Sequence, residues 1–442
     1  MRFPLSPFWA LLLCALVLPT SALAQNGRAA SGTFFFADCR IETVAAGTIE
    51  NGGVLVREGR IEAVGADATA PSDATVIPCD GGTIYPGLID SGTRLGLLEV
   101  GSLDETRDFR EVGEVTPQMQ ALTAVNPNSV LIPEARLGGV TTVLTVPDGG
   151  TMPGMAALIH LHGYTPAQMD AGFRAVVLDY PSSARRGSWD RREQSEIDKA
   201  FERAMETIDE TWDEAELYAR IDSAYAASPN ADREPAYQPE MAALLPVVRG
   251  AMPLLITVDA AKDIQHALGW VEERGVKAIL SSVAEGWRVA DEIAEAGVPV
   301  LVGPVLSLPT RDSDRYDKPY QNAALLHQAG VQVALRTGEV ENVRNIAFNA
   351  GFAAAYGREI GFGPAEALRA VTLTPAEIFG VADEVGSIEV GKRATLFVAT
   401  GDPFETATQI THVFIDGYQV PMESRQTELY DEFLDRSPGL AK

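Results

Sequence analysis

The feature that most constrains the fold is an alternation of short apolar runs and amphipathic helices between residues 84 and 357. The apolar runs are rich in Val, Ile, Leu and Ala, which is typical of parallel strands covered on both faces. Strand and helix in turn, repeated about eight times, predict an α/β barrel. The expected strands are Ile84–Ile89, Val140–Val146, Ala156–Leu161, Ala175–Leu178, Leu254–Val258, Ala278–Ser282, Val298–Val302 and Val331–Leu335. The pattern leaves open which of Ala156–Leu161 and Ala175–Leu178 lies in the barrel.

Both ends of this alternating region are flanked by shorter β-type runs separated by Gly, Pro, Asn and Asp. The C-terminal runs alone would make a marginally stable sheet. We therefore expect residues 33–83 and 385–425 to form one composite β-sandwich domain beside a barrel spanning residues 84–384. Within the barrel, a helical insertion at about residues 190–250 contains a long amphipathic helix, Arg192–Ala226. It packs on the outside of the barrel, covers the barrel as a flap, or makes an oligomer contact.

Residues 1–24 have the pattern of a secretory signal. Arg2 precedes an apolar stretch, Phe8–Leu18, and Ala22-Leu23-Ala24 forms a small-residue cleavage site. The stretch is shorter than the roughly 20 residues of a membrane-spanning helix. We expect export to a bacterial periplasm or beyond, with no membrane span after cleavage. Cys39 and Cys79 then remain, either bridged or as two free thiols.

The charge balance narrows the class of partner. The formal net charge of −26 argues against nucleic acid or an anionic membrane. With 46% hydrophobic and 22% charged residues in 442, the composition is that of a globular protein with a large core. The expected partner is a small-molecule ligand or substrate at the barrel mouth, and a homo-oligomer remains open.

Several motifs in order resemble the amidohydrolase superfamily, in particular secreted amidohydrolase-related proteins of bacteria. Pro86-Gly87-Leu88-Ile89-Asp90 is similar to its first barrel strand, and Gly139–Val143 to its second. Ala367–Thr372 and Gly386–Lys392 are similar to its closing helix and last strands. The resemblance implies a (β/α)8 TIM-like barrel with a composite β-sandwich. It also implies a hydrolase of non-peptide C–N bonds in amides or cyclic amides.

The resemblance also implies where metal ligands should stand. Family members usually hold one or two divalent ions, which lower the pKa of bound water and generate hydroxide. Their ligands are a His pair after the first strand, a Lys or Glu on a middle strand, His on the fifth and sixth strands, and Asp on the eighth. The corresponding positions here are Gly92, Arg94, Thr257, Ser282 and Gly338. Glycine offers no side-chain ligand, and a guanidinium is permanently cationic. We therefore expect no cofactor, and a divalent metal such as zinc only through non-standard ligands.

Other residues are candidates for a metal site or for catalysis. His160 and His162 stand two apart on an expected strand, which places both side chains on one face. At least three protein ligands are usual, so hydrogen-bonded packing is the alternative for this pair. Arg94 could pair with Asp90, Asp259 or Glu285. There it either replaces the ion electrostatically, holding the mouth together or receiving a substrate carboxylate, or forms a structural salt bridge. The catalytic candidates are Asp90, Arg94, Asp259 and Glu285.

Two functions follow from these observations. The first is the secreted C–N hydrolase that the resemblance implies. The second is a non-catalytic relative that binds a ligand or a partner protein with the same mouth. The sequence leaves open whether the chain is an enzyme, because fold does not entail function.

Overall fold

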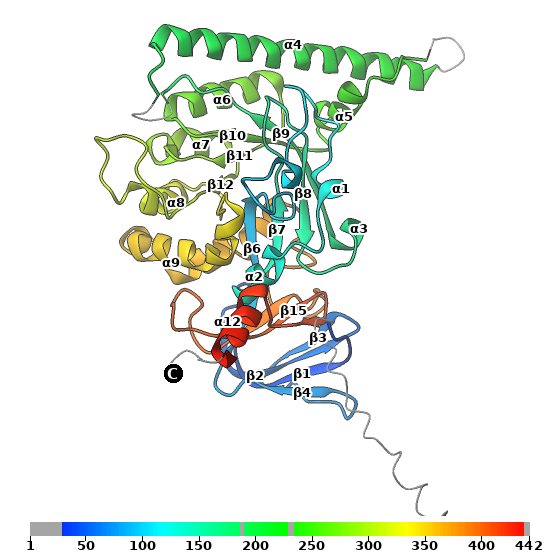
Figure 1. The fold of residues 1–442 in the computed structure, drawn as a ribbon, viewed down its shortest axis with the longest axis vertical. Coiled ribbons are helices and arrows are strands. Elements are labelled where there is room, and N and C mark those ends of the chain that lie inside the picture. The colour runs from blue at the N-terminus through cyan, green and yellow to red at the C-terminus, as the bar shows by residue number, and fades with distance from the viewer. Residues whose placement is uncertain (1–28, 186–189, 229–233, 437–442) are drawn as a thin grey trace, which may run out of the picture.

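The computed structural model describes residues 29–185, 190–228 and 234–436. The expected secretory signal, residues 1–24, lies outside them. The chain forms two eight-stranded sheets, one in the barrel and one built from both chain ends (Figure 1). In the described part of the chain, no helix is both long and apolar enough to cross a membrane.

The barrel sheet has the strand order β6-β7-β8-β9-β10-β11-β12-β13. Its two outer strands, β6 and β13, are brought together by the N–H of Gly338, which donates to the carbonyl of Gly92 at 3.0 Å. The predicted TIM-like barrel is therefore confirmed as a nearly closed barrel. The strands are β6 (Leu88–Thr93), β7 (Val140–Thr145), β8 (Met155–His160), β9 (Asp170–Asp179), β10 (Leu254–Val258), β11 (Ala278–Ser282), β12 (Val300–Val302) and β13 (Val333–Leu335).

One strand departs from the expected parallel arrangement. β8 runs antiparallel to both β7 and β9, and the other neighbouring pairs in the sheet are parallel. Only residues 146–154 separate β7 from β8, and 161–169 separate β8 from β9. A parallel connection needs a dozen or more residues, so these short links permit only hairpins. Both middle runs lie in the barrel, which answers the question that the sequence left open.

A second departure lies at the start of the barrel. The sequence predicts one strand over Ile84–Ile89, but the structure has β5 (Thr83–Pro86) in the composite sheet and β6 in the barrel. Gly87 separates them, and its N–H donates to the carbonyl of Thr395 at 3.0 Å. A Cβ at Gly87 would collide with the side chain of Thr141, so the chain passes between the two sheets where only glycine fits.

The composite domain unites both chain ends, as predicted, although its strands share one hydrogen-bonded sheet rather than two. Its order is β16-β15-β14-β5-β1-β2-β3, with β4 paired to β1. Cys39 and Cys79 are joined by a disulfide with a Cα–Cα distance of 5.2 Å. The strands are β1 (Phe34–Glu42), β2 (Thr48–Arg57), β3 (Arg60–Gly65), β4 (Thr75–Pro78), β5, β14 (Leu396–Ala399), β15 (Ile410–Ile415) and β16 (Tyr418–Val420).

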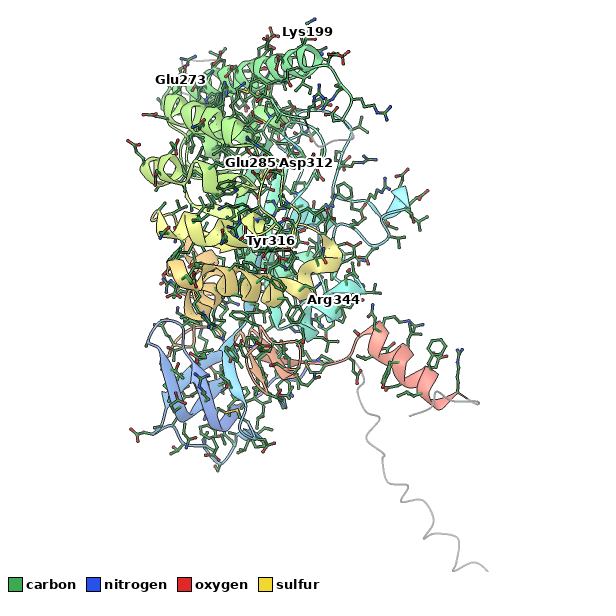
Figure 2. The ribbon with its side chains drawn as sticks, turned by 90° about the vertical axis from the view of Figure 1, so that its left-hand side faces the viewer. Lys199, Glu273, Glu285, Asp312, Tyr316 and Arg344 are labelled. Atoms are coloured by element: carbon green, nitrogen blue, oxygen red, sulfur yellow. A yellow bond between two sulfur atoms is a disulfide. The ribbon has the colours of Figure 1, made fainter. Side chains whose placement is uncertain are left out.

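The long inserted helix α4 (Gln194–Ala227) lies across the end of the molecule farthest from the composite domain (Figure 1). It packs on α6 (Ala261–Arg274), where the rings of Trp212 and Trp270 meet edge to face with their centres 5.5 Å apart. The indole N–H of Trp270 donates to Asp209 at 3.0 Å. Figure 2 shows the same end of the molecule, with Lys199 on α4 and Glu273 on α6, and shows α12 projecting from the opposite end. The insertion therefore packs on a helix outside the barrel sheet, and its residues Ala200, Phe201 and Ala204 also line a cavity at the barrel mouth.

The helices cover the strands and fill the connections. The α-helices are α1 (Ala121–Ala124), α2 (Leu131–Leu137), α3 (Pro166–Met169), α4, α5 (Pro239–Val248), α6 (Ala261–Arg274), α7 (Ala290–Ala296), α8 (Lys318–Gln328), α9 (Ile346–Gly357), α10 (Pro364–Ala370), α11 (Leu373–Ile378) and α12 (Arg425–Asp435). The 3-10 helices are η1 (Asp104–Thr106), η2 (Gly286–Arg288), η3 (Val340–Asn345) and η4 (Arg358–Ile360).

Candidate functional site at the barrel mouth

Polar side chains gather where the parallel strands end. Asp179 ends β9, Asp259 follows β10 and Arg336 follows β13. Because these strands are parallel neighbours in one barrel, their carboxyl ends meet at one mouth, which is where TIM-barrel enzymes place their chemistry. These residues form the centre of the candidate site.

The guanidinium of Arg336 occupies the centre of the mouth. A Cβ added at Gly92 would lie 2.9 Å from Nε and 3.2 Å from Cζ of Arg336. Nη1 of Arg336 donates to the hydroxyl of Ser281 at 2.7 Å. The space into which a side chain at position 92 would project is therefore already filled by a cation.

Four carboxylates surround this cation. Burial lowers the pKa of Arg336, and the opposing influence of the acids comes first from Asp90, then from Asp259, Asp179 and Glu339. A guanidinium stays charged under these conditions because its ordinary pKa is above 12. Arg336 thus offsets part of the negative charge of the acids at the strand ends.

Asp90, a catalytic candidate from the sequence, is wholly buried at the closure of the barrel. Its carboxylate accepts hydrogen bonds from the N–H and hydroxyl of Thr337, and from the N–H of Gly92 at 3.1 Å. Burial raises the pKa of Asp90 to about 6 against these hydrogen bonds. The residue ties β6 to the end of β13, and its oxygens are engaged by the backbone and by Thr337.

Among the acids at the mouth that line a cavity, Asp179 has the carboxyl group whose pKa is shifted most. Burial, followed by the negative charge of Asp148, raises the pKa of Asp179 to about 7, against hydrogen bonds from Thr257 and Gly149 and the charge of Arg336. Thr257 is its direct neighbour across the β9–β10 ladder. A group with a pKa near neutrality can both accept and donate a proton at neutral pH.

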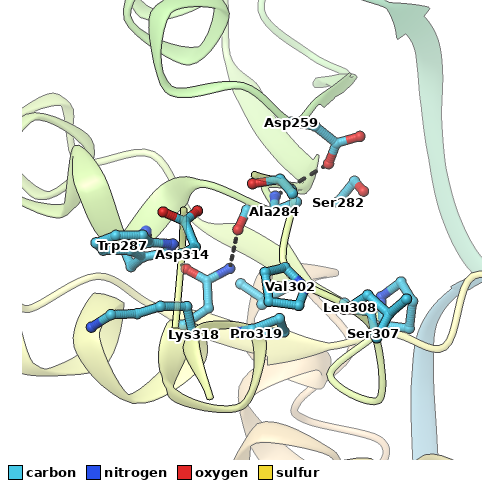
Figure 3. Close-up of a pocket in the computed structure, with 15 residues that line it drawn as sticks. Asp259, Ser282, Ala284, Trp287, Val302, Ser307, Leu308, Asp314, Lys318 and Pro319 are labelled. Carbon is cyan, nitrogen blue, oxygen red and sulfur yellow. Dashed lines mark hydrogen bonds between the residues drawn. The ribbon is translucent and has the colours of Figure 1, made fainter. Parts of the chain in front are cut away.

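Asp259 and Ser282 lie side by side at the ends of β10 and β11 (Figure 3). The Oδ1 atom of Asp259 accepts from the N–H of Ala284 at 3.1 Å, and its side chain is exposed. Ser282 has a φ of 74°, in the left-handed region that residues other than glycine seldom adopt. This backbone conformation turns the chain at the end of β11, and Ser282 lines a cavity there.

Glu285 is 3% exposed and fully engaged by its surroundings. It accepts two hydrogen bonds from Arg311 at 2.5 Å, one from the hydroxyl of Thr310 at 2.8 Å and one from the N–H of Ala261 at 3.0 Å. Burial raises the pKa of Glu285, but these donors, led by Arg311, outweigh it and hold the pKa below its usual range. Through these hydrogen bonds Glu285 connects the loop between β12 and α8, which carries Thr310 and Arg311, to the start of α6 at Ala261.

Arg94 lies at the rim. Its guanidinium pairs with Asp148 at 3.1 Å and with Glu339 at 2.6 Å, and it lies 5.0 Å from the centre of the Phe109 ring. The sequence suggested Asp90, Asp259 or Glu285 as its partners, and the structure shows a different pair. The cation at the centre of the mouth is Arg336, because the side chain at position 94 points to the loop that carries Asp148.

His160 and His162 lie away from the mouth. Because β8 is antiparallel, its C-terminal end sits with the amino-terminal halves of its neighbours, and His160 pairs with Thr142 of β7 at 3.1 Å. Burial lowers the pKa of His160, whose Nε2 is 3.9 Å from Asp416 of the composite domain. His162 instead packs on the ring of Tyr418 at 4.9 Å. The two histidines thus face the composite domain.

The residues of the mouth differ from the donors that the metal implied by the resemblance would need. Within residues 29–185, 190–228 and 234–436, no three His, Cys, Asp or Glu side chains are arranged to hold an ion. At the other expected ligand positions, Thr257 contacts Asp179, Ser282 lines a cavity, and Gly338 closes the barrel. A divalent ion needs several anionic or neutral donors, and the centre of this mouth holds a cation instead. The residues do not fit such an ion.

Two adjoining cavities open at the mouth. The larger, about 910 Å³, is lined by six carboxylates, three arginines and part of α4, including Phe201. The smaller, about 210 Å³, lies under the loop between β12 and α8 (Figure 3). Asp259, Ala284 and Thr310 line both cavities. The carboxylates of the larger cavity are Glu114, Asp148, Asp179, Asp259, Asp263 and Glu285, and its arginines are Arg185, Arg192 and Arg311.

Sequence reasoning missed Asp179 and Arg336. Each directly follows an apolar strand run, Ala175–Leu178 and Val331–Leu335 respectively. The first polar residue after a parallel strand is the one that a barrel presents at its mouth, so this position was the available signal.

Comparison with known proteins decides the family. The model of the amidohydrolase family matches residues 83–420, which is most of the chain. The chain belongs to the amidohydrolase family. An amidohydrolase, tasK, of Hapsidospora irregularis is 22% identical over 397 residues, covering 83% of this chain. This chain spans only 39% of the length of that relative.

Solved structures agree with the family assignment. An amidohydrolase from Thermotoga maritima has a TM-score of 0.75 and 25% identity, covering 88% of this chain and 99% of its own. Molinate hydrolase has a TM-score of 0.54 and 18% identity, covering 89% and 95% respectively. The second likeness is one of fold alone. This amidohydrolase-family chain therefore shares its fold with these two proteins over nearly its whole described length.

Proposed function

We propose that this amidohydrolase-family chain binds a small molecule in its barrel mouth without a metal ion, and that it does not hydrolyse that molecule. The observation that carries the proposal is the position of Arg336, whose Nε lies 2.9 Å from where the Cβ of a residue at position 92 would be. Position 92 is where the resemblance to the superfamily implies the first metal-binding His.

The charges of the mouth support binding without an ion. Arg336 sits among Asp90, Asp179, Asp259 and Glu339, so a fixed cation of the protein stands among the acids and offsets part of their charge. Unlike a metal, a guanidinium cannot polarise water into hydroxide, because it has no open coordination position. The mouth keeps a cavity of about 910 Å³, and the carboxylates and hydroxyls on its walls can fix the orientation of a bound molecule.

One observation favours a second candidate, a hydrolase that acts without a metal. Asp179 has a pKa raised to about 7 and lines the larger cavity. In that reaction its carboxylate would take a proton from water as the water oxygen bonds to the amide carbon. It would then return the proton to the nitrogen as the C–N bond breaks. Asp179 would be the general base and then the general acid.

Metal analysis combined with an activity assay tests the proposal. The purified full chain is expected to contain far less than one equivalent of Zn, Mn, Fe, Co or Ni. It is also expected to leave linear amides, cyclic amides and molinate unhydrolysed, with or without added Zn²⁺ or Mn²⁺. Near-stoichiometric metal that a chelator removes would overturn the proposal. Metal-free hydrolysis that disappears in Asp179→Asn would establish the second candidate in its place.

A further inference from the structure

The smaller cavity has the character of a binding subsite. Its wall combines the apolar side chains of Trp287, Val302, Leu308 and Pro319 with polar ones such as Asp259, Asp314 and Lys318 (Figure 3). Pro304 and Pro309 add to the apolar part. Small-molecule sites in proteins are concave and mostly apolar, with a few polar groups that fix orientation. The loop between β12 and α8 that builds one wall is held in place by the ion pair between Arg311 and Glu285.

The volume of this cavity limits what it can hold. It measures about 210 Å³. A protein cavity of about 150 Å³ is large enough to bind benzene. The cavity therefore has room for one six-membered ring, while anything attached to that ring must extend into the larger cavity of about 910 Å³.

Asp259, at the junction of the two cavities, determines what charge a substituent on the bound ring should carry. Asp259 lines both cavities and accepts one hydrogen bond, from the backbone N–H of Ala284 at 3.1 Å. In the described part of the chain no side chain donates to it. The other charged groups of the small cavity have side-chain partners, since Asp314 pairs with Arg288, and Lys318 lies 4.7 Å from the Trp287 ring and 3.4 Å from Gln321.

We infer that the mouth takes an organic cation made of a single ring and a short amine, with the ring in the small cavity and the ammonium group on Asp259. This inference rests on the proposed metal-free binding function and names its ligand class. The ammonium would supply the side-chain hydrogen-bond donor that Asp259 lacks, and would add positive charge where four carboxylates face the single guanidinium of Arg336. The ring would displace water from the apolar part of the wall.

An anionic ligand fits the same surface poorly. The larger cavity presents six carboxylates against three arginines, and one of these arginines, Arg311, is committed to Glu285. Arg336, the central cation, is absent from the described lining of either cavity. A carboxylate entering the mouth would therefore meet like charges before reaching a free guanidinium.

The test is calorimetric titration of the metal-analysed full chain at pH 7.5 with four probes. Benzylamine carries both ring and cation, benzyl alcohol the ring alone, methylamine the cation alone, and phenylacetate the ring with an anion. Benzylamine is expected to bind about tenfold or more tightly than each of the others, because it alone satisfies both subsites.

Three variants complete the test. Asp259→Asn removes the charge and is expected to reduce benzylamine affinity about tenfold, to that of benzyl alcohol. Ser307→Phe, at a loop position lining the small cavity, is expected to abolish the advantage of benzylamine over methylamine. Asp312→Asn removes an exposed carboxylate of the same loop that is not among the cavity residues, and is the matched control with unchanged affinity.

The outcomes separate the two proposals. In a metal-free sample, tighter binding of phenylacetate, no binding of any probe, or equal effects of Asp259→Asn and Asp312→Asn would overturn the ligand class alone. Stoichiometric metal in the same sample would overturn the proposed function and this inference with it. If Ser307→Phe fails to fold by circular dichroism, the comparison of benzylamine with methylamine on the parent chain still decides the role of the ring.

Discussion

Asp90 on β6 and Thr337 after β13 join the first and last strands of the barrel through one buried carboxylate. That carboxylate accepts both the N–H and the hydroxyl of Thr337, and also the N–H of Gly92. Since the described strands β6 and β13 form no ladder with each other in the barrel sheet, this junction is central to its closure.

The first prediction concerns this junction. Asp90→Ala would leave a buried hydroxyl and two backbone N–H groups without an acceptor, and should lower the free energy of unfolding by about 3 kcal/mol. Asp90→Asn keeps an acceptor oxygen in the same place and should cost clearly less. Urea denaturation at pH 7 measures both. Equal losses in the two variants would show that the hydrogen bonds to the carboxylate do not hold the barrel closed.

The second prediction concerns pH. The pKa of Asp179 is raised from 3.8 to about 7, so between these values the folded state binds a proton more tightly than the unfolded chain. This contribution to stability is complete below pH 3.8 and is lost as pH rises to about 7. Asp179→Asn should therefore be more stable than the parent at pH 8, by on the order of 2 kcal/mol after allowance for solvent screening. The difference should shrink toward pH 5, as thermal melts across this range would measure. A difference independent of pH would contradict the assigned burial of Asp179.

The third prediction contrasts two arginines. Arg336→Met removes the central cation and leaves four carboxylates around an apolar side chain, whereas Arg94→Met removes a cation at the rim. Because Ca²⁺ prefers oxygen ligands, the first variant should gain several degrees in melting temperature from millimolar Ca²⁺. The parent chain and Arg94→Met should not respond. A calcium response of the same size in all three proteins would mean that Arg336 does not neutralise the mouth.

The fourth prediction concerns the composite domain. The disulfide between Cys39 and Cys79 closes a loop with a sequence separation of 40 residues. Replacing both cysteines with Ala should destabilise this domain by about 3–4 kcal/mol, because the unfolded chain regains the freedom of that loop. Unfolding of the oxidised parent, the reduced parent and the double variant measures the effect. The reduced parent should behave like the double variant, and stability unchanged by reduction would contradict the bridge.

Much of the architecture could be predicted from the sequence because it follows from periodicity. The buried runs Leu254–Val258 and Ala278–Ser282 became β10 and β11 with the predicted bounds, since apolar runs of this length suit a covered parallel strand. The direction of β8 could not be predicted from its own residues. It depends on the short connections before and after it, which composition does not reveal.

The candidate site was harder to predict because it depends on which side chains meet across the barrel. Gly92 was identified as a lost ligand position, but the residue that fills its space is 244 positions away, and the pairing exists only in the folded barrel. His160 and His162 had a plausible ligand spacing, and their distance from the mouth follows entirely from the antiparallel direction of β8. Glu285 was a catalytic candidate from the sequence, but its partners Thr310 and Arg311 lie on another loop and could not be paired with it from the sequence.

The central claim is that Arg336 fills the space next to Gly92, and a double-mutant cycle tests it most directly. Gly92→Ala in the parent chain should cost about 1–3 kcal/mol of unfolding free energy, because the new Cβ would press on the buried guanidinium. The same substitution in an Arg336→Ala background should cost almost nothing, which gives a coupling energy of about that size. An equal cost of Gly92→Ala in both backgrounds would contradict the account, because it would show that the space beside position 92 is not held by Arg336.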